Sequence, residues 1–316
     1  MNWTSNSLIA LRGLAMGIAE VIPGVSGGTI AFITGIYERL LAAIKNILGP
    51  EIIQGLRTGG IAKAWVAIDG VFVASLLSGM ALGIIIGIFG VTHLMENYPE
   101  MLWAFFFGLI IASAAFIARQ VTRWSLQAWL ALLVGAALAF FITIATPSQG
   151  TEALWFVFVA GAVAISALIL PGVSGSFVLL LLGMYTTIIG AVKSLLQSFD
   201  IQSLLIVSVF AVGCIVGLAT FSRVLSWMFR RYHNLTLALL TGFILGSLNK
   251  IWPWRNVVEY RLNSKGEQVP FIERSVAPAQ YEGEPFLIGV ALCFIIGFAT
   301  VWLIERAGKK KHPTHA

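Results

Sequence analysis

The sequence predicts an all-α polytopic membrane protein made of two inverted repeats, each with a re-entrant helical hairpin and three transmembrane helices. Of its 316 residues, 58% are hydrophobic and only 11% are charged, whereas a soluble domain has about 25% charged residues. The stretch PGVSGGT at residues 23–29 returns 148 residues later as PGVSGSF. An apolar chain with an internal repeat of this length indicates a duplicated bundle of membrane helices.

The repeated motif interrupts helices inside apolar segments. Proline removes a backbone donor and glycine tolerates positive φ, so the motif breaks a helix. Broken backbone at membrane depth persists only where protein or a water-filled cavity surrounds it. Free N–H groups at the start of the next helix can then bind an anion, and matched breaks in two halves are typical of a transporter binding site. The alternative is a kink where helices pack closely through small residues.

In the first half, the sequence predicts a hairpin followed by three spans. Residues 8–22 are apolar apart from Arg12 and Glu20. They would extend about 22 Å, which is short of the roughly 30 Å hydrocarbon core, so we expect a hairpin whose second arm is residues 29–48. Residues 50–69 mix charges with isoleucines and a tryptophan, which suits a helix lying at the membrane interface. The predicted spans are residues 71–93, 101–118 and 127–145.

The second half repeats this plan, with a hairpin formed by residues 153–170 and 177–196. Glycines at 79 and 83 match those at 213 and 217, Gly108 matches Gly242, and Gly135 matches Gly289. The repeat therefore covers nearly the whole chain, and the predicted domains are residues 1–147 and 148–316. The spans expected in this half are residues 204–221, 235–251 and 286–304.

The distribution of charge predicts the orientation. If each hairpin returns to its own side, each half crosses the membrane three times, and an odd number makes the repeats inverted. One side then carries most basic residues, including Arg39, Arg123 and Arg230, while the other carries Glu96 and Glu152. The positive-inside rule places the basic side in the cytoplasm, together with both termini.

Composition also argues against several other classes. The net charge of +6 comes from basic residues dispersed between apolar segments, so we expect no nucleic acid partner. Cys214 and Cys293 lie within apolar segments and the four histidines are scattered, so we expect no metal ligands, no cofactor and no catalytic residue. Residues 1–11 lack the basic region of a cleaved signal peptide.

The motifs resemble those of the bacterial polyprenyl-phosphate transporter family over essentially the full length. The features that carry the resemblance are Arg12-Gly13, PGVSGGT at 23–29, GIYE at 35–38, LPGVSGS at 170–176, LLLGMY at 180–185 and GSL at 246–248 before WPW. The resemblance implies transport of undecaprenyl phosphate, the lipid carrier of cell-wall precursors, from the outer to the inner leaflet of the bacterial cytoplasmic membrane. It implies the lipid and the bilayer as partners, and we leave the assembly open between a monomer and a homodimer.

A phosphate on a polyprenyl tail requires a donor-rich cradle. Backbone N–H groups around both turns and the hydroxyls of four residues can supply neutral donors. Arg12 is the cation within the first hairpin arm, and arginine binds phosphate well through its planar fork. Its alternatives are reaching to the interface or pairing with Glu20 or Glu38. The predicted phosphate-binding residues are Arg12, Gly24, Ser26, Gly27, Gly28, Thr29, Gly172, Ser174, Gly175 and Ser176.

Five further residues are candidates for coupling or gating, namely Glu20, Glu38, Arg39, Tyr37 and Tyr185. Glu20 and Glu38 could carry protons, because burial raises the pKa of a carboxyl group towards neutrality, or they could pair with Arg12 or Arg39. Tyr37 and Tyr185 match between the halves, although tyrosines at such positions often form an interface belt. In the second half Ala160 and Leu168 stand where Arg12 and Glu20 stand in the first. The charged chemistry is therefore expected in a single copy.

Two rival functions are considered. Membrane undecaprenyl-diphosphate phosphatases resemble the chain in style, but they carry an arginine after Pro-Gly-x-Ser and a paired Glu-x-x-x-Glu, whereas here Gly27 and Gly175 follow the serines. The pair at that spacing, Glu96 and Glu100, is expected in a loop far from either turn. An anion channel or exchanger is the second rival, since chloride channels also use broken helices in inverted repeats.

Overall fold

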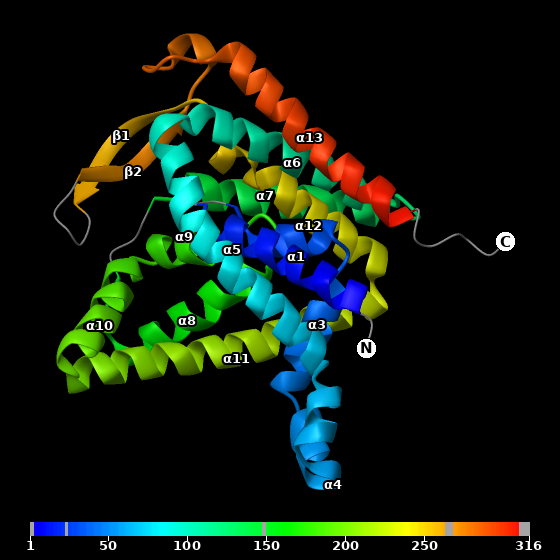
Figure 1. Ribbon diagram of the computed structural model, residues 1–316. Coiled ribbons are helices and arrows are strands. Elements are labelled where there is room, and N and C mark those ends of the chain that lie inside the picture. The colour runs from blue at the N-terminus through cyan, green and yellow to red at the C-terminus, as the bar shows by residue number, and fades with distance from the viewer. Residues whose placement is uncertain (1–2, 23–24, 147–149, 263–267, 310–316) are drawn as a thin grey trace. The chain divides into compact units, whose positions relative to one another are not determined.

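The computed structural model describes residues 3–22, 25–146, 150–262 and 268–309 (Figure 1). Helices dominate, as predicted for a polytopic membrane protein. Among the described residues, five helices are long and apolar enough to cross a membrane, and the number rises to seven if each of two bent helix pairs is one span. The five are α5 (Gly70–Asn97), α6 (Pro99–Ala118), α7 (Leu126–Ile144), α11 (Ile201–Arg231) and α12 (His233–Ser247) with the short turn η1 (Leu248–Ile251).

The chain is interrupted at both predicted turns, and each predicted second arm is itself broken. The bend is 120° between α2 and α3 and 108° between α9 and α10. The prediction of one continuous arm over residues 29–48 was therefore wrong, because Gly35 has φ +71° and its counterpart Gly183 has φ +67°, a conformation that ends a helix. The helices are α1 (Trp3–Val21), α2 (Gly27–Ile33), α3 (Tyr37–Ile47), α8 (Leu154–Ile169), α9 (Gly175–Leu181) and α10 (Tyr185–Ser198).

The chain folds into two compact units that each combine parts of both sequence halves. The first unit is Met1–Ile88 with Ile144–His233, and the second is Phe89–Thr143 with Asn234–Ala316. Both hairpins therefore belong to the first unit. The predicted division into residues 1–147 and 148–316 separates the two sequence repeats and not the two compact units, and it remains a prediction.

In the first unit, matching glycines bring matching helices together. A Cβ added at Gly83 of α5 would lie 2.1 Å from the carbonyl oxygen of Leu14 in α1. A Cβ at Gly217 of α11 would lie 2.4 Å from the carbonyl oxygen of Ala162 in α8. The glycines differ by 134 residues and their partners by 148, which are the offsets of the sequence repeat. The two helix pairs are therefore packed in the same way, through backbone contacts that allow no side chain.

In the second unit, α6 packs on α13 (Leu287–Lys309) and α12 packs on α7. A Cβ at Gly135 would lie 2.2 Å from the carbonyl oxygen of Leu239, and a Cβ at Gly297 would lie 1.9 Å from that of Phe105. Phe105 and Leu239 are separated by the repeat offset of 134 residues, so they occupy equivalent positions in the two repeats. The glycines that contact them, Gly297 and Gly135, are therefore equivalent to each other as well. The predicted match with Gly289 was wrong, because it aligned similar small residues without their packing partners.

The segment between the predicted spans 235–251 and 286–304 contains a β-hairpin. Strands β1 (Arg255–Leu262) and β2 (Gln268–Ser275) pair antiparallel and are followed by the short turn η2 (Pro278–Gln280). The hairpin is anchored at its base, where the indole N–H of Trp252 donates to the carbonyl oxygen of Val276 at 2.8 Å. The valines and tyrosine of β1 favour extended backbone in this segment.

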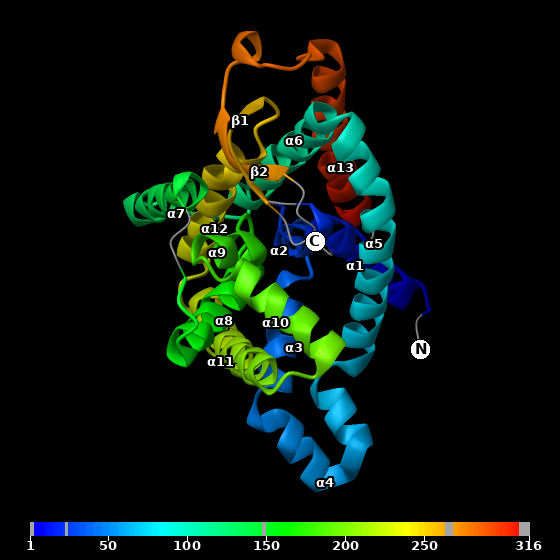
Figure 2. The same ribbon diagram turned by 90° about the vertical axis from the view of Figure 1, so that its left-hand side faces the viewer.

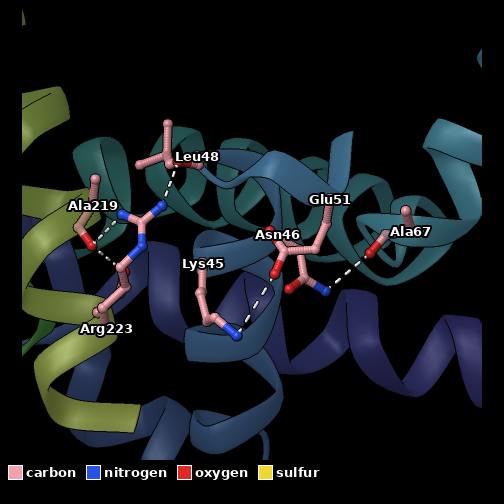
Figure 3. A network of polar contacts seen from close by, with 8 residues as sticks. Lys45, Asn46, Leu48, Glu51, Ala67, Ala219 and Arg223 are labelled. Carbon is pink, nitrogen blue, oxygen red and sulfur yellow. Dashed lines mark hydrogen bonds and ion pairs between the residues drawn. The ribbon is translucent and has the colours of Figure 1, made fainter. Parts of the chain in front are cut away.

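The predicted interfacial helix is a bent element, α4 (Pro50–Ala67), interrupted at Gly59 and Gly60. It projects from the rest of the first unit in both views (Figures 1 and 2). Its base is held by Asn46, which donates to the carbonyl oxygen of Ala67 at 2.9 Å, and by Arg223 of α11, which donates to that of Leu48 at 2.7 Å (Figure 3). Its large apolar side chains at Ile53, Leu56, Ile61, Trp65 and Val66 are exposed, and its place at the membrane interface remains a prediction.

Candidate functional site

The two repeated turns contact each other within the first unit. The backbone N–H of Gly172 donates to the hydroxyl of Thr29 at 2.9 Å. The phenol of Tyr37 donates to the carbonyl oxygen of Ile169 at 3.0 Å, and the hydroxyl of Ser26 lies 3.4 Å from the carbonyl oxygens of Leu168 and Leu170. Residues about 140 positions apart are thereby joined at the helix breaks, as the paired motif led us to expect.

The serines of the motif begin the short helices. Ser26 caps α2 by accepting from the N–H of Gly28 at 3.1 Å, and Ser174 caps α9 by accepting from that of Phe177 at 3.5 Å. Serine suits this position, because its oxygen satisfies an N–H group that has no partner within the helix. The hydroxyls of Ser174 and Ser176 lie 3.0 Å apart. Gly24 lies outside the described residues.

Several donors of the predicted cradle are already bound to the protein. The N–H of Gly27 donates to Glu20 Oε1 at 2.7 Å, and Gly172 is engaged by Thr29. A Cβ at Gly175 would lie 2.5 Å from the carbonyl oxygen of Ala164, so this glycine permits close helix packing. Ser26 and Thr29 are fully buried, whereas Ser176 is exposed. In this conformation the second turn presents the accessible hydroxyl group.

Arg12 lies in a different part of the first unit from the turns. It precedes Glu20 on α1 by eight residues, about 12 Å along the helix axis. Within the part of the chain that the structure describes, Arg12 forms no ion pair with Glu20 or Glu38. The alternative in which Arg12 pairs with one of these carboxylates is therefore not found, and Arg12 forms no hydrogen bond or ion pair with the described residues of either turn.

The remaining coupling candidates have different environments. Glu38 is exposed, while Glu20 is half-buried and bonded to Gly27. Tyr37 is buried and packs on Phe229 of α11, with ring centroids 6.0 Å apart, so it does not belong to an interface belt. Tyr185 is half-buried against the core between α8, α10 and α11.

A buried polar cluster in the second unit was missed in the sequence. Glu100 is in the first turn of α6, not in a loop, and it is buried. Tyr281 donates to its Oε1. Burial raises the pKa of the Tyr281 phenol, and its hydrogen bond to Glu100 raises it further. Nearby, Arg255 pairs with Glu273 at 2.9 Å and lies over the ring of Trp103. Pro99 at the start of α6 is the signal that could have placed Glu100 in a helix.

Among the described residues, no group of three histidine, cysteine, aspartate or glutamate side chains could hold a metal ion. The structure as described has paired helix breaks that meet inside a set of apolar helices. This defines a polytopic helical membrane protein of the broken-helix type, an architecture found in many secondary transporters.

The sequence matches known proteins of one family. The profile of the VCA0040-like family, described as undecaprenyl phosphate translocase-like, matches residues 16–269. A polyprenyl-phosphate transporter from Vibrio cholerae serotype O1 is 44% identical over 282 residues, which are 89% of this chain and 88% of that protein. One from Staphylococcus aureus is 30% identical over 257 residues, 77% of this chain and 85% of that protein. No solved structure matches. The chain therefore belongs to the undecaprenyl phosphate translocase-like family.

Proposed function

We propose that this protein carries undecaprenyl phosphate from the outer to the inner leaflet of the bacterial cytoplasmic membrane, which returns the lipid carrier for cell-envelope synthesis. The observation that supports this most directly is the contact between the two repeated turns, through Thr29 and Gly172. Helix breaks that meet in this way provide polar backbone at a place where a headgroup can be bound. The naming of the relatives in V. cholerae and S. aureus as polyprenyl-phosphate transporters supports the same lipid.

The turns would bind the phosphate through neutral donors. Ser176 is exposed and its hydroxyl lies 3.0 Å from that of Ser174, so we assign these two residues the first contact. The hydroxyls of Ser26 and Thr29 and the N–H groups at Gly27, Gly28 and Gly172 would join when the turns separate. Each of these groups now has a hydrogen-bond partner within the protein. Exchange of that partner for a phosphate oxygen would keep the number of hydrogen bonds nearly constant, so it would cost little free energy.

Glu20 is our candidate for coupling this exchange to a proton. Its carboxylate oxygen accepts from Gly27 at 2.7 Å, and a charged acceptor makes a stronger hydrogen bond than a neutral one. Protonation of Glu20 would weaken the bond and release the N–H of Gly27. Glu38 is exposed, and exposure favours a surface role over proton transfer.

The function is tested by reconstituting the purified protein into liposomes that contain undecaprenyl phosphate. We expect the protein to make outer-leaflet lipid phosphate inaccessible to an added enzyme at a rate far above that of empty liposomes. An unchanged transbilayer distribution would contradict the proposal. Release of phosphate from undecaprenyl diphosphate would favour the phosphatase, and chloride flux without lipid dependence would favour the channel.

Inverted topology remains part of this proposal, and it predicts the sides of two loops in the second unit. The β-hairpin contacts the first turns of α6 through Arg255 of β1, which lies over the ring of Trp103, while Arg123 follows the last turn of that helix. A helix of this length is about 30 Å long, so the two loops should lie on opposite sides. After Cys214 and Cys293 are replaced by alanine, Gln268→Cys should react with an impermeant maleimide added to intact cells, and Arg123→Cys should not. Labelling of Arg123→Cys from outside would contradict the orientation.

A further inference from the structure

A cluster of charged side chains lies where α1, α3 and α5 meet in the first unit. Arg39 of α3 binds Asp69 through two contacts, Nε to Oδ2 at 2.6 Å and Nη2 to Oδ1 at 3.0 Å. Its guanidinium also lies 4.4 Å from the ring centroid of Phe72, which is fully buried. Stacking on this ring orients the guanidinium plane, while about half of the side chain stays exposed.

Arg12 brings a second guanidinium to this place. Its neighbour Gly13 is packed so closely on α5 that a Cβ would lie 2.2 Å from the carbonyl oxygen of Leu76. Leu76 is one helical turn beyond Phe72, on which Arg39 stacks. Arg12 and Arg39 are thus both positioned at the first two turns of α5, one through the packing of its neighbour Gly13 and the other through its contact with Phe72. The carboxylate of Asp69 engages Arg39 with both oxygens, so this group of three charges keeps an excess of positive charge.

Asp69 is held in an unusual backbone conformation. It connects α4 to α5 with φ +55°, in the left-handed region that glycine, asparagine and aspartate adopt more readily than other residues. Its carbonyl oxygen accepts from the N–H of Val73 at 3.1 Å, in the first turn of α5. The backbone therefore presents this carboxylate to Arg39. The pair is about half exposed, and exposed ion pairs contribute little and exchange readily with other ions.

We propose that Arg12 and Arg39 form a second binding station for the phosphate monoester, in which Asp69 occupies the place that the phosphate takes. A carboxylate offers two oxygens and satisfies one arginine fork, whereas a phosphate monoester offers three oxygens and about two charges, enough for both arginines. The station rests on the proposed function, because it assigns the headgroup of the same lipid a position separate from the repeated turns. The lipid would pass between the turns and this station during transport.

The station is tested by the binding of farnesyl phosphate to the purified full-length protein in detergent, measured by calorimetry. Arg39→Gln and Arg12→Gln should each weaken binding about tenfold or more, since each removes a charge-assisted contact. Asp69→Asn should strengthen it several-fold, because the competing charge is lost and asparagine tolerates the left-handed conformation. Arg57→Gln, which removes one exposed positive charge from α4, is the matched control and should bind like the wild type.

Three comparisons complete the experiment. Farnesol, which has no phosphate group, should not bind at the station. The affinity for phosphatidylglycerol, a phosphodiester, should be the same in the wild type and in Asp69→Asn. A response confined to inorganic phosphate would overturn the lipid assignment. Unchanged or weaker binding by Asp69→Asn, with normal binding by Arg39→Gln, would overturn the station even if the wild type transports the lipid in liposomes. Loss of the proposed function would appear differently, as wild-type protein that shows the predicted binding changes but moves no lipid.

Discussion

Gly83→Ala is expected to destabilise the protein by forcing two packed helices apart. The new Cβ would lie 2.1 Å from the carbonyl oxygen of Leu14, so α1 and α5 would have to separate. Overpacking of this kind costs about 1–3 kcal/mol or more. The midpoint of thermal unfolding in detergent, followed by tryptophan fluorescence, should fall by several degrees, and Gly217→Ala should behave in the same way because its Cβ would lie 2.4 Å from the carbonyl oxygen of Ala162.

Gly90→Ala is the matched control for this prediction. Gly90 also lies in α5, but a Cβ there would meet nothing within 4 Å. Because alanine favours the helix over glycine by about 1 kcal/mol, this variant should unfold at the same temperature as the wild type or slightly above it. Equal midpoints for Gly83→Ala and Gly90→Ala would mean that the close approach of α1 and α5 does not contribute to stability.

Glu20→Gln is expected to lose most transport while keeping the fold. The glutamine oxygen can still accept from the N–H of Gly27, which Glu20 now holds at 2.7 Å, but the side chain can neither ionise nor take up a proton. A hydrogen bond to a charged group exceeds a neutral one by roughly 1–1.5 kcal/mol, so the transport rate in liposomes should fall about tenfold or more. The thermal midpoint should fall by no more than a few degrees, because the glutamine oxygen keeps a neutral hydrogen bond to the N–H of Gly27.

Glu38→Gln makes the same chemical change at an exposed position of α3 and should transport normally. Glu20→Ala should lose both transport and stability, because the N–H of Gly27 would be left without its acceptor. Normal transport by Glu20→Gln would show that Glu20 serves as an acceptor for the turn and nothing more.

The sequence determined the helix breaks, because their causes are local. A Pro-Gly-x-Ser-Gly run ends a helix wherever it occurs, so α2 and α9 begin 148 residues apart, at Gly27 and Gly175, as the repeat indicates. The lengths of the apolar runs likewise determined the spans, and helices α5, α6, α7 and α11 lie where they were expected. The kink at Gly35 was missed, since a single glycine breaks a helix only when its conformation demands it.

The tertiary structure decided which side chains contact one another. Arg12 was expected to meet a phosphate at the turn or a glutamate, yet its neighbour Gly13 is packed on Leu76 in the first part of α5, one helical turn from the Phe72 ring that Arg39 contacts. Gly135 corresponds to Gly297 because both face equivalent carbonyl groups, a relation that no residue type reveals. Such partners lie far apart in the chain, and their meeting depends on how several helices pack at once. The identity of a charged residue therefore indicates that it needs a partner, while only the packed structure determines which partner it has.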